Sequence, residues 1–361
     1  MRIAQVTSLQ ESVPPVDKNG LEFVVHFLTE GLIARGHEVT LFGTGDSKTS
    51  ARLHVLWPTA VSRDLFGSKM DGAYFSRWSH EAAYLRSNEF DLIHTHDVCG
   101  MFWALLQSPL VVTVHSPVER VIPPYKKHFP RRYWPYMGNL ENKLRDTYLV
   151  FISESQRRHY PKGRHHFVVH NGIPVDDFTF CLNPDSYFAF LGYMNPAKGA
   201  HVAIEAARRA QVELRIAGKI NTYLDREYFK EKIEPALDGR KIRFLGPLRY
   251  FEKIEFLRKA RAVFVPVQWE EPFGLVMVEA MACGTPVIAL NRGAVPEIVV
   301  NKKTGFVCEN VEEMVEAVKK IDQIDRRVCR EHVEKNFSVE KMVEGYEKVY
   351  EQVIEDFEGR F

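Results

Sequence analysis

Short runs of β-forming residues alternate with helical patterns along the whole chain, and this alternation limits the possible folds more than any other feature. The first half opens with an expected strand at Arg2–Thr7, a helix from about Gly20 to Arg35 and a strand at Glu38–Phe42. The remaining strands expected in this half are Asp91–His94, Leu110–His115, Tyr148–Ile152 and Phe167–His170. Because parallel strands need long crossover connections, usually helices, the pattern indicates an α/β fold with parallel sheets.

The alternation stops in a turn-rich stretch at residues 171–186 and then begins again. The second series of expected strands is Tyr187–Leu191, Glu213–Ala217, Lys241–Leu245, Ala262–Pro266, Pro286–Leu290 and Gly305–Cys308. A chain of 361 residues also suits two domains of roughly 150 residues each. We therefore expect an α/β protein with two Rossmann-like, doubly wound domains, at residues 1–172 and 173–340. A last helix at 341–361, with Ser338 just before it as N-cap, is long enough to return to the first domain.

Composition narrows the class of protein. Apolar residues make up 45% and charged residues 26%, which is ordinary for a globular protein. The sequence contains five cysteines, namely Cys99, Cys181, Cys283, Cys308 and Cys329. They are never spaced as CxxC, so they favour neither a disulfide framework nor a zinc site. A reducing cytoplasm fits this usage best. No apolar run approaches the roughly 20 residues of a membrane-spanning helix, so any membrane contact would be peripheral.

The formal net charge is +1, so no overall field recruits nucleic acid. One region departs from this balance, because residues 120–164 hold eleven basic residues against three acidic ones, with aromatic residues interleaved. Such a region suits an anionic acceptor or a peripheral contact with lipid headgroups. A solvated face with some buried aromatic residues is the alternative.

The strongest local signal is the segment WEEPFGLVMVEAMACGTPVIAL, which follows the expected strand Ala262–Pro266. Open parallel sheets bind ligands at the carboxyl ends of their strands, and two such sheets that face each other form a cleft there. A helix starting near Gly274 leaves the N–H groups of Phe273, Gly274 and Leu275 without intrahelical partners, at the positive end of the helix dipole. Hydroxyl or phosphate groups suit these donors.

Two carboxylates accompany the donors. Glu271 precedes the helix, and Glu279 lies inside it with a side chain that leans toward the N-terminus. Together they can accept hydrogen bonds from several sugar hydroxyls, so the segment favours polyol recognition. The alternative is that Glu271 caps the helix and that Glu279 forms a buried ion pair.

Two lysines follow other strands of the second domain. Lys198 and the next helix N-terminus come after the strand that ends at Leu191, where a diphosphate could lie. Lys219 follows the strand that ends at Ala217 and could supply a second positive charge. Lysine is an effective point charge for phosphate. For Lys219, a solvated surface position is the alternative.

The core E-P-F-G-x-x-x-x-E, with A-M-A-x-G-x-P-V-I-A and G-x-V-P-E-I after it, resembles the family 4 retaining glycosyltransferases. These are two-Rossmann (GT-B) enzymes that use nucleotide-sugar donors. The similarity extends over essentially the whole chain, including ESVPP with NGLE near the start, RGHEVTLF, TVH and VVHNGI.

The resemblance implies roles for the second-domain residues. The carboxylate at Glu271 and the backbone at Phe273–Leu275 would hold the donor sugar, and Glu279 would hold the ribose. Relatives usually carry an arginine where this chain has Tyr193, so the donor phosphates are left to Lys198 and Lys219. The strand end at Phe244–Leu248 matches the position at which relatives hold the nucleobase.

In the first domain the resemblance points to two residues. Gly20 is the second position of a Gly-Gly pair that relatives place against the donor phosphates, and Asn19 stands at the first position. His115 resembles the histidine that this family directs at the donor sugar and the reacting centre. On its own, a histidine at a strand end is more often structural.

A metal is not expected. The DxD triplet on which the other major glycosyltransferase architecture relies is absent, and the HxHD run at residues 94–97 has no evident further ligand. Lys198, Lys219 and the helix N-termini would replace a cation beside the leaving diphosphate.

The resemblance implies a metal-independent, retaining hexosyltransferase without a separate cofactor, with catalytic residues His115, Glu271 and Lys198. UDP-glucose is the first expected donor and GDP-mannose the second. The acceptor stays open among glycans, lipids and small metabolites, as does the choice between double displacement and same-face attack. A non-catalytic nucleotide-sugar-binding or regulatory protein is one alternative, because Tyr193 replaces the arginine. A phosphorylase or epimerase on the same fold is another.

Overall fold

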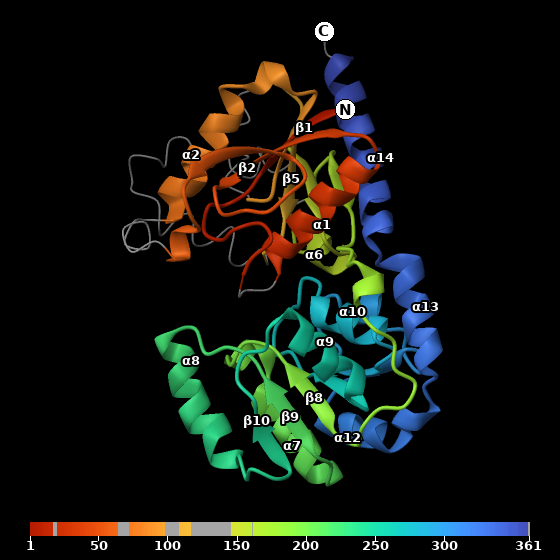
Figure 1. Ribbon diagram of the computed structural model, residues 1–361. Helices are drawn as coiled ribbons and strands as arrows, with labels where there is room; N and C mark the ends of the chain where they lie inside the picture. The colour runs from red at the N-terminus through yellow and green to blue at the C-terminus, as the bar shows by residue number, and fades with distance from the viewer. Residues whose placement is uncertain (17–19, 64–71, 98–107, 117–145, 161, 360–361) are drawn as a thin grey trace. The chain divides into compact units, whose positions relative to one another are not determined.

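The computed structural model describes residues 1–361 apart from 17–19, 64–71, 98–107, 117–145, 161 and 360–361. The chain divides into two compact units (Figure 1). Unit 1 comprises Met1–Gly172 together with Val339–Phe361, and unit 2 comprises Ile173–Ser338. The last helix therefore belongs to unit 1, and it begins two residues before the expected boundary.

In the described part of unit 1, a seven-stranded sheet has the order β3-β2-β1-β4-β5-β6-β7, with every pair parallel. The strands are β1 Arg2–Val6, β2 Glu38–Thr44, β3 Arg52–Trp57, β4 Leu92–Thr95, β5 Leu110–Val114, β6 Tyr148–Phe151 and β7 His166–Val168. The central strands β4, β5 and β6 are buried along their whole length, as expected for a sheet covered on both faces.

Strand β3 was not predicted. It lies at the edge of the sheet, and each of its six residues is exposed or only partly buried. An edge strand of this kind needs no continuous apolar run, so RLHVLW gave a weak signal in the sequence.

The helices in the described part of unit 1 are α1 Leu21–Ala34, α2 Gly72–Tyr84, the short α6 Glu154–Arg158 and α14 Val339–Glu358. Helix α14 packs against α1 and β5. Its inner face is apolar: Met342, Val343, Val349 and Val353 are buried, as are Tyr346 and Tyr350.

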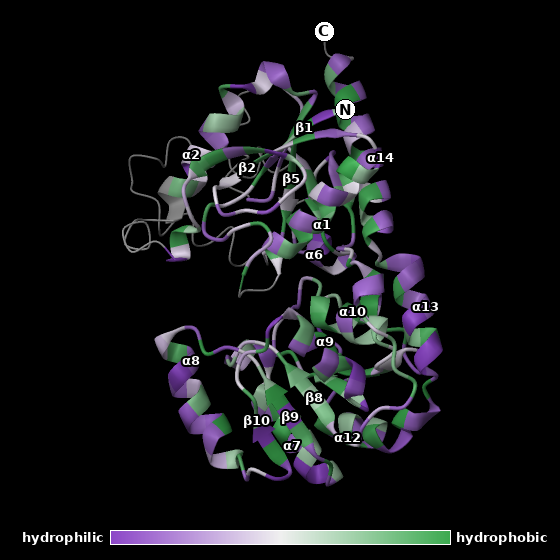
Figure 2. Cartoon of the chain, viewed as in Figure 1, coloured by the Kyte–Doolittle hydropathy of each residue, from purple (hydrophilic) through white to green (hydrophobic). Residues whose placement is uncertain are grey.

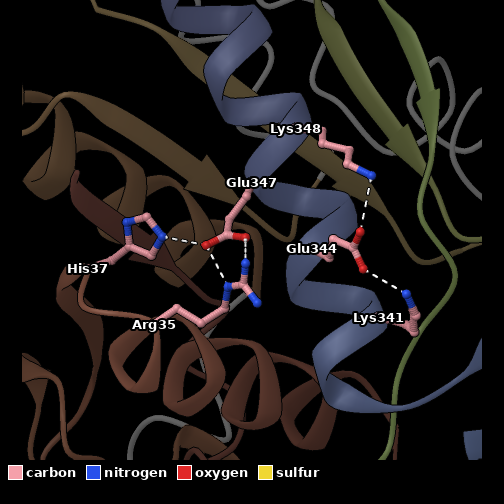
Figure 3. Close-up of polar contacts among 6 residues, drawn as sticks. All are labelled: Arg35, His37, Lys341, Glu344, Glu347 and Lys348. Atoms are coloured by element: carbon pink, nitrogen blue, oxygen red, sulfur yellow. Dashed lines mark hydrogen bonds and ion pairs between the residues drawn. The ribbon is translucent and has the colours of Figure 1, made fainter.

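Polar contacts also attach α14 to unit 1 (Figure 3). Glu347 accepts a hydrogen bond of 2.8 Å from Nε of Arg35 and lies 2.9 Å from Nε2 of His37. On the same helix, Glu344 pairs with Lys341 and Lys348. The burial and these contacts together make α14 an integral part of unit 1.

Unit 2 contains a six-stranded parallel sheet with the order β10-β9-β8-β11-β12-β13. The strands are β8 Phe188–Leu191, β9 Leu214–Ala217, β10 Ile242–Phe244, β11 Ala262–Val265, β12 Val287–Leu290 and β13 Gly305–Cys308. The helices are α7 Ala200–Ala210, α8 Tyr223–Tyr228, α9 Tyr250–Lys259, α10 Leu275–Ala282, α11 Val295–Ile298, α12 Val311–Lys320 and α13 Arg326–Asn336. Helix α7 packs against α12, and α10 packs against α9 and α13.

The hydropathy of the strands in unit 2 differs from that of its helices. In Figure 2 the strands of unit 2 are mostly apolar, whereas α7, α12 and α13 alternate between polar and apolar residues around their axes. Such helices cover a sheet with one face and meet solvent with the other. The apolar faces of these helices and the strands together form the core of unit 2.

Both strand orders follow the Rossmann pattern, in which the direction of winding reverses between two neighbouring central strands. The reversal lies between β1 and β4 in unit 1 and between β8 and β11 in unit 2. Loops after these strands leave the sheet on opposite faces and open a crevice at the carboxyl edge. The residues after β1, β4, β8 and β11 therefore come first as candidates for a site.

Candidate active site

The predicted lysine and the first predicted carboxylate meet at the carboxyl edge of the unit 2 sheet. Lys198 follows β8 and Glu271 follows β11, and their Nζ and Oε2 atoms lie 2.6 Å apart. The Nε1–H group of Trp269 donates to the same oxygen at 2.7 Å, and the Lys198 ammonium lies 5.0 Å from the Trp269 ring centroid. The Glu271 side chain is 8% exposed and that of Lys198 is 26% exposed. Glu271 thus does not cap the helix but joins Lys198 and Trp269 in one cluster.

The loop between Glu271 and α10 brings backbone donors to the cluster. Gly274 is the N-cap residue of α10 with a φ of 85°, a left-handed conformation that favours glycine. Phe273 is buried, and its ring packs edge-on against Phe337 at 5.9 Å. The loop is therefore held in place where the helix dipole is positive and the first N–H groups have no intrahelical acceptors.

Glu279 makes the buried ion pair that the sequence left as an alternative. Its Oε1 atom lies 2.6 Å from Nζ of Lys253 on α9, and the lysine side chain is only 2% exposed. The Glu279 side chain is 12% exposed. A ribose would have to share this carboxylate with Lys253.

Lys219 joins the same edge through its backbone, because its carbonyl accepts a hydrogen bond of 2.9 Å from the N–H of Met194. The loop after β9 is thereby tied to the loop after β8, which carries Tyr193 and Lys198. A role for the Lys219 ammonium beside phosphate stays a prediction.

In unit 1, Gly20 is the N-cap residue of α1, with a φ of 117° and no atom within 4 Å of a Cβ placed there. His115 follows β5, is partly buried, and has Nε2 at 3.1 Å from Nδ1 of His96. Burial lowers the pKa of His115 to about 3, so its imidazole is neutral at physiological pH.

His94 and His96 of the HxHD run lie in a buried hydrogen-bond network rather than in a cluster of ligands. Across the described residues, no group of three His, Cys, Asp or Glu side chains could hold a metal ion. The described cysteines at 181, 283, 308 and 329 are buried free thiols, whereas Cys99 lies outside the described residues. Most of the basic region at 120–164 also lies outside them.

Comparison with known families decides the identity. The family model described as Glycosyltransferase Family 4 matches residues 18–177, and the model described as Glycosyl transferases group 1 matches residues 182–336. The chain belongs to the family 4 glycosyltransferases.

Relatives of this glycosyltransferase are similar over most of their length. An uncharacterized glycosyltransferase of Methanocaldococcus jannaschii is 27% identical, with 74% of this chain and 77% of the relative covered. A glycogen synthase of Mycobacterium tuberculosis is 26% identical, with coverages of 82% and 80%. A phosphatidyl-myo-inositol mannosyltransferase of Mycobacterium leprae is 25% identical, with coverages of 85% and 83%.

Solved structures agree with a GT-B fold of two Rossmann-like domains. Sucrose-phosphate synthase from Thermosynechococcus elongatus superposes with a TM-score of 0.75 at 21% identity, covering 98% of this chain and 99% of that chain. HepE of Anabaena, solved in complex with UDP-glucose, superposes with a TM-score of 0.68 at 16% identity, covering 99% and 100%. Within the described residues, no helix is long and apolar enough to cross a membrane.

Sequence reasoning missed three residues that shape the glycosyltransferase site. Trp269 and Lys253 bind the two predicted carboxylates, and Gly293 supports the loop that carries Glu271. The N–H of Gly293 donates to Oε2 of Glu270 at 2.7 Å, and a Cβ at Gly293 would lie 2.2 Å from the Glu271 nitrogen. The Gly in G-x-V-P-E-I was the available signal, but pattern alone did not say which backbone it touches.

Proposed function

We propose that this glycosyltransferase is a metal-independent, retaining hexosyltransferase that uses a nucleotide diphosphate sugar. One observation carries the proposal: Lys198, Glu271 and Trp269 form a single cluster at the carboxyl edge of the unit 2 sheet, close in sequence to the N-terminus of α10. This cluster offers a cation for phosphate, and the carboxylate and N–H groups suit sugar hydroxyls. We infer that unit 2 binds the donor and unit 1 the acceptor, with no separate cofactor.

The chemistry follows from these charges. The bond between the anomeric carbon and the diphosphate oxygen breaks, and negative charge grows on the leaving phosphate. Lys198, assisted by Lys219 and by the N–H group of Leu275, stabilises that charge. The acceptor oxygen then bonds to the anomeric carbon on the face that the diphosphate leaves, and its proton passes to the departing phosphate. His115 would hydrogen-bond to the donor sugar or orient the acceptor.

UDP-glucose is the first donor we propose and GDP-mannose the second. The solved complex of HepE with UDP-glucose supports the first, and the mannosyltransferase of Mycobacterium leprae supports a mannosyl donor. The acceptor stays open among glycans, lipids and small metabolites. We place the enzyme in the cytoplasm, with peripheral membrane contact through residues 120–164 for a lipid acceptor.

A donor screen tests the proposal. Thermal unfolding is measured with a panel of nucleotide sugars, since a ligand that binds only the native state raises the melting temperature by mass action. The stabilising donor is then incubated, with and without excess EDTA, with candidate acceptors and with water alone. NMR of the product should show retained anomeric configuration, and the rate should not depend on the chelator.

Other outcomes identify the rival functions. Stabilisation without transfer or slow hydrolysis in single-turnover experiments would mean a nucleotide-sugar-binding or regulatory protein. Phosphate-dependent turnover without nucleotide would mean a phosphorylase, and interconversion of free nucleotide sugars would mean an epimerase. Strict dependence on Mg²⁺ or Mn²⁺ would contradict the role given to Lys198.

A further inference from the structure

A chain of hydrogen bonds in unit 1 runs from His115 to helix α14. The mechanism proposed above gives these bonds no role. The chain of bonds starts at a residue expected to touch substrate and ends inside the core. Its members are Gln5 on β1, His94 on β4, His96 after β4, Thr113 on β5, His115 after β5, and Tyr346 and Tyr350 on α14. Polar groups are buried at a cost unless they are bonded, so such a chain calls for an explanation.

The sheet register brings the first members together. Gln5 pairs with His94 across β1 and β4, so their side chains can lie on the same face of the sheet. His94 and His96 are two residues apart and also share a face, with ring centroids 4.2 Å apart. The rings of His96 and His115 follow at 5.3 Å. Three imidazoles thus lie in sequence from the core to the strand end.

The contacts near His115 set the direction of the hydrogen bonds. Gln5 presents its amide oxygen to Nε2 of His96 at 2.8 Å, so Nε2 of His96 must carry a hydrogen. In a neutral imidazole the other nitrogen, Nδ1, is then an acceptor. Nδ1 lies 3.1 Å from Nε2 of His115, which must therefore donate.

The far end of the chain agrees with this direction. The Gln5 amide nitrogen lies 3.3 Å from both Nδ1 of His94 and the Tyr350 hydroxyl, and the two latter atoms are 2.7 Å apart. His94 then accepts at Nδ1 and donates from Nε2 to the Thr113 hydroxyl at 2.7 Å. Thr113 can pass its own hydrogen to Tyr346 at 2.9 Å. Every nitrogen of His94 and His96 has a partner that fits one protonation pattern.

All three imidazoles are neutral near pH 7. Burial is the main cause that lowers the pKa of His94 and of His96 well below the ordinary value, and burial alone lowers that of His115. The tautomer of each ring is therefore set by its hydrogen bonds and not by titration.

We propose that His96 is a positioning residue for His115: by accepting from Nε2–H, it holds His115 in the tautomer whose bare Nδ1 can accept a hydrogen bond from a substrate hydroxyl. The inference rests on the proposed function only in giving His115 a substrate. Gln5 fixes His96, and α14 closes the chain through Tyr350. The C-terminal helix thereby contributes to the orientation of a residue at the opposite end of the network.

The tautomer can be measured on the full chain without any substrate. In protein labelled with ¹⁵N-histidine, the shifts of the two ring nitrogens show which carries hydrogen, and the His115→Asn spectrum assigns the signals. We expect hydrogen on Nε2 and a bare Nδ1 for His115. Hydrogen on Nδ1 instead would overturn the proposal, whether or not a donor has been found.

Variants separate positioning from packing. His96→Leu removes the acceptor, and we expect mixed tautomers at His115 with kcat about 10- to 100-fold lower and a nearly unchanged KM for the donor. His96→Asn places an amide oxygen close to the former Nδ1 and should restore both the Nε2–H signal and most of kcat. Unchanged His115 signals in His96→Leu would contradict the proposal.

His80→Leu is the matched control. His80 is another fully buried histidine of unit 1, but it bonds to the Ser76 carbonyl and the Thr95 hydroxyl and makes no bond to His96 or His115. Its loss should lower the melting temperature while leaving the His115 signals and kcat unchanged. If His80→Leu changed the His115 tautomer as much as His96→Leu does, a general packing effect would explain both, and the proposal would be wrong.

Discussion

At the scale of residues, the site depends on an ion pair between a lysine and a glutamate. Lys198 and Glu271 lie on different loops and meet at 2.6 Å, with Trp269 bonded to the same carboxylate oxygen. The Lys198 ammonium has three N–H donors, so it can bond to the Glu271 carboxylate and to a phosphate at the same time. The ion pair thus fixes the positions of two residues that the sequence predicted for the site.

Replacing Lys198 tests its charge. In Lys198→Met we expect kcat to fall by about 10²- to 10³-fold, since one lost contact to developing charge has that effect in other enzymes. Steady-state kinetics with the donor identified by the thermal screen measures it. Lys319→Met is the control, because Lys319 is an exposed lysine on α12 of the same unit. Equal rates in the two variants would remove Lys198 from the mechanism.

The Lys253–Glu279 pair allows stability and ligand binding to be separated. Lys253→Met leaves a carboxylate that is only 12% exposed without its cation, so we expect unfolding to become easier by about 3–5 kcal/mol. The double variant Lys253→Met with Glu279→Met should recover most of that loss, because a buried pair replaced by apolar side chains is often neutral. Denaturant unfolding measures both.

Donor binding should respond differently to the same variants. If Glu279 holds the ribose, the double variant stays folded but loses the thermal shift with nucleotide sugar. A stable double variant that keeps the full shift would show that Glu279 is structural only.

At the scale of elements, the loop before α10 is held by a neighbouring loop. Gly293 has a φ of 59°, and a Cβ there would lie 2.2 Å from the nitrogen and 2.3 Å from the oxygen of Glu271. Ala294 also donates from its N–H to the Glu271 carbonyl at 2.8 Å. The position of Glu271 is therefore set by backbone packing as much as by its side-chain partners.

Gly293→Ala should displace the Glu271 loop. We expect a lower melting temperature and a donor Kd raised about tenfold, which corresponds to about 1.4 kcal/mol. Gly239→Ala is the matched control, because Gly239 has a φ of 68° but no atom within 4 Å of its Cβ position. It carries the same backbone penalty without the clash, so its Kd should not change. Equal Kd changes in both would point to backbone strain rather than to the contact with Glu271.

The elements that the sequence predicted are those whose burial is one-sided or complete. The buried runs of β5 and β12 and the apolar stripe of α14 leave a clear periodicity, because the hydrophobic effect acts on them directly. Strand β3 lies at an edge and lacks that signal. Contacts between loops depend on the order of the strands in the sheet, and a local sequence pattern does not predict that order. The close approach of Gly293 to the Glu271 backbone and the ion pair between Lys198 and Glu271 are two such contacts. The family resemblance supplied the candidate residues but not their partners.

At the scale of the whole molecule, the two units differ in how deeply their histidines are buried. His80, His94 and His96 are at most 3% exposed. Their pKa values lie below the ordinary value, chiefly because burial penalises the charged imidazole. In unit 2, His201 and His332 are only partly buried. Acid should therefore weaken unit 1 first.

The direction of the effect follows from proton binding. The unfolded chain takes up a proton on each of these histidines below a pKa of about 6.5, whereas the folded chain does not. The stabilisation is complete above that pH and is lost as the pH falls toward the lower folded-state pKa. For each histidine the free energy of unfolding falls by at most about 1.4 kcal/mol per pH unit.

Hydrogen exchange, corrected for intrinsic rates, should show lower protection of β4 and β5 at about pH 5.5 than at about pH 7, with a smaller change in β11 and β12. His94→Gln should reduce this pH dependence, and His159→Gln, at an exposed position, should not. Equal losses of protection in the two units would mean that the buried histidines do not control the acid stability of unit 1.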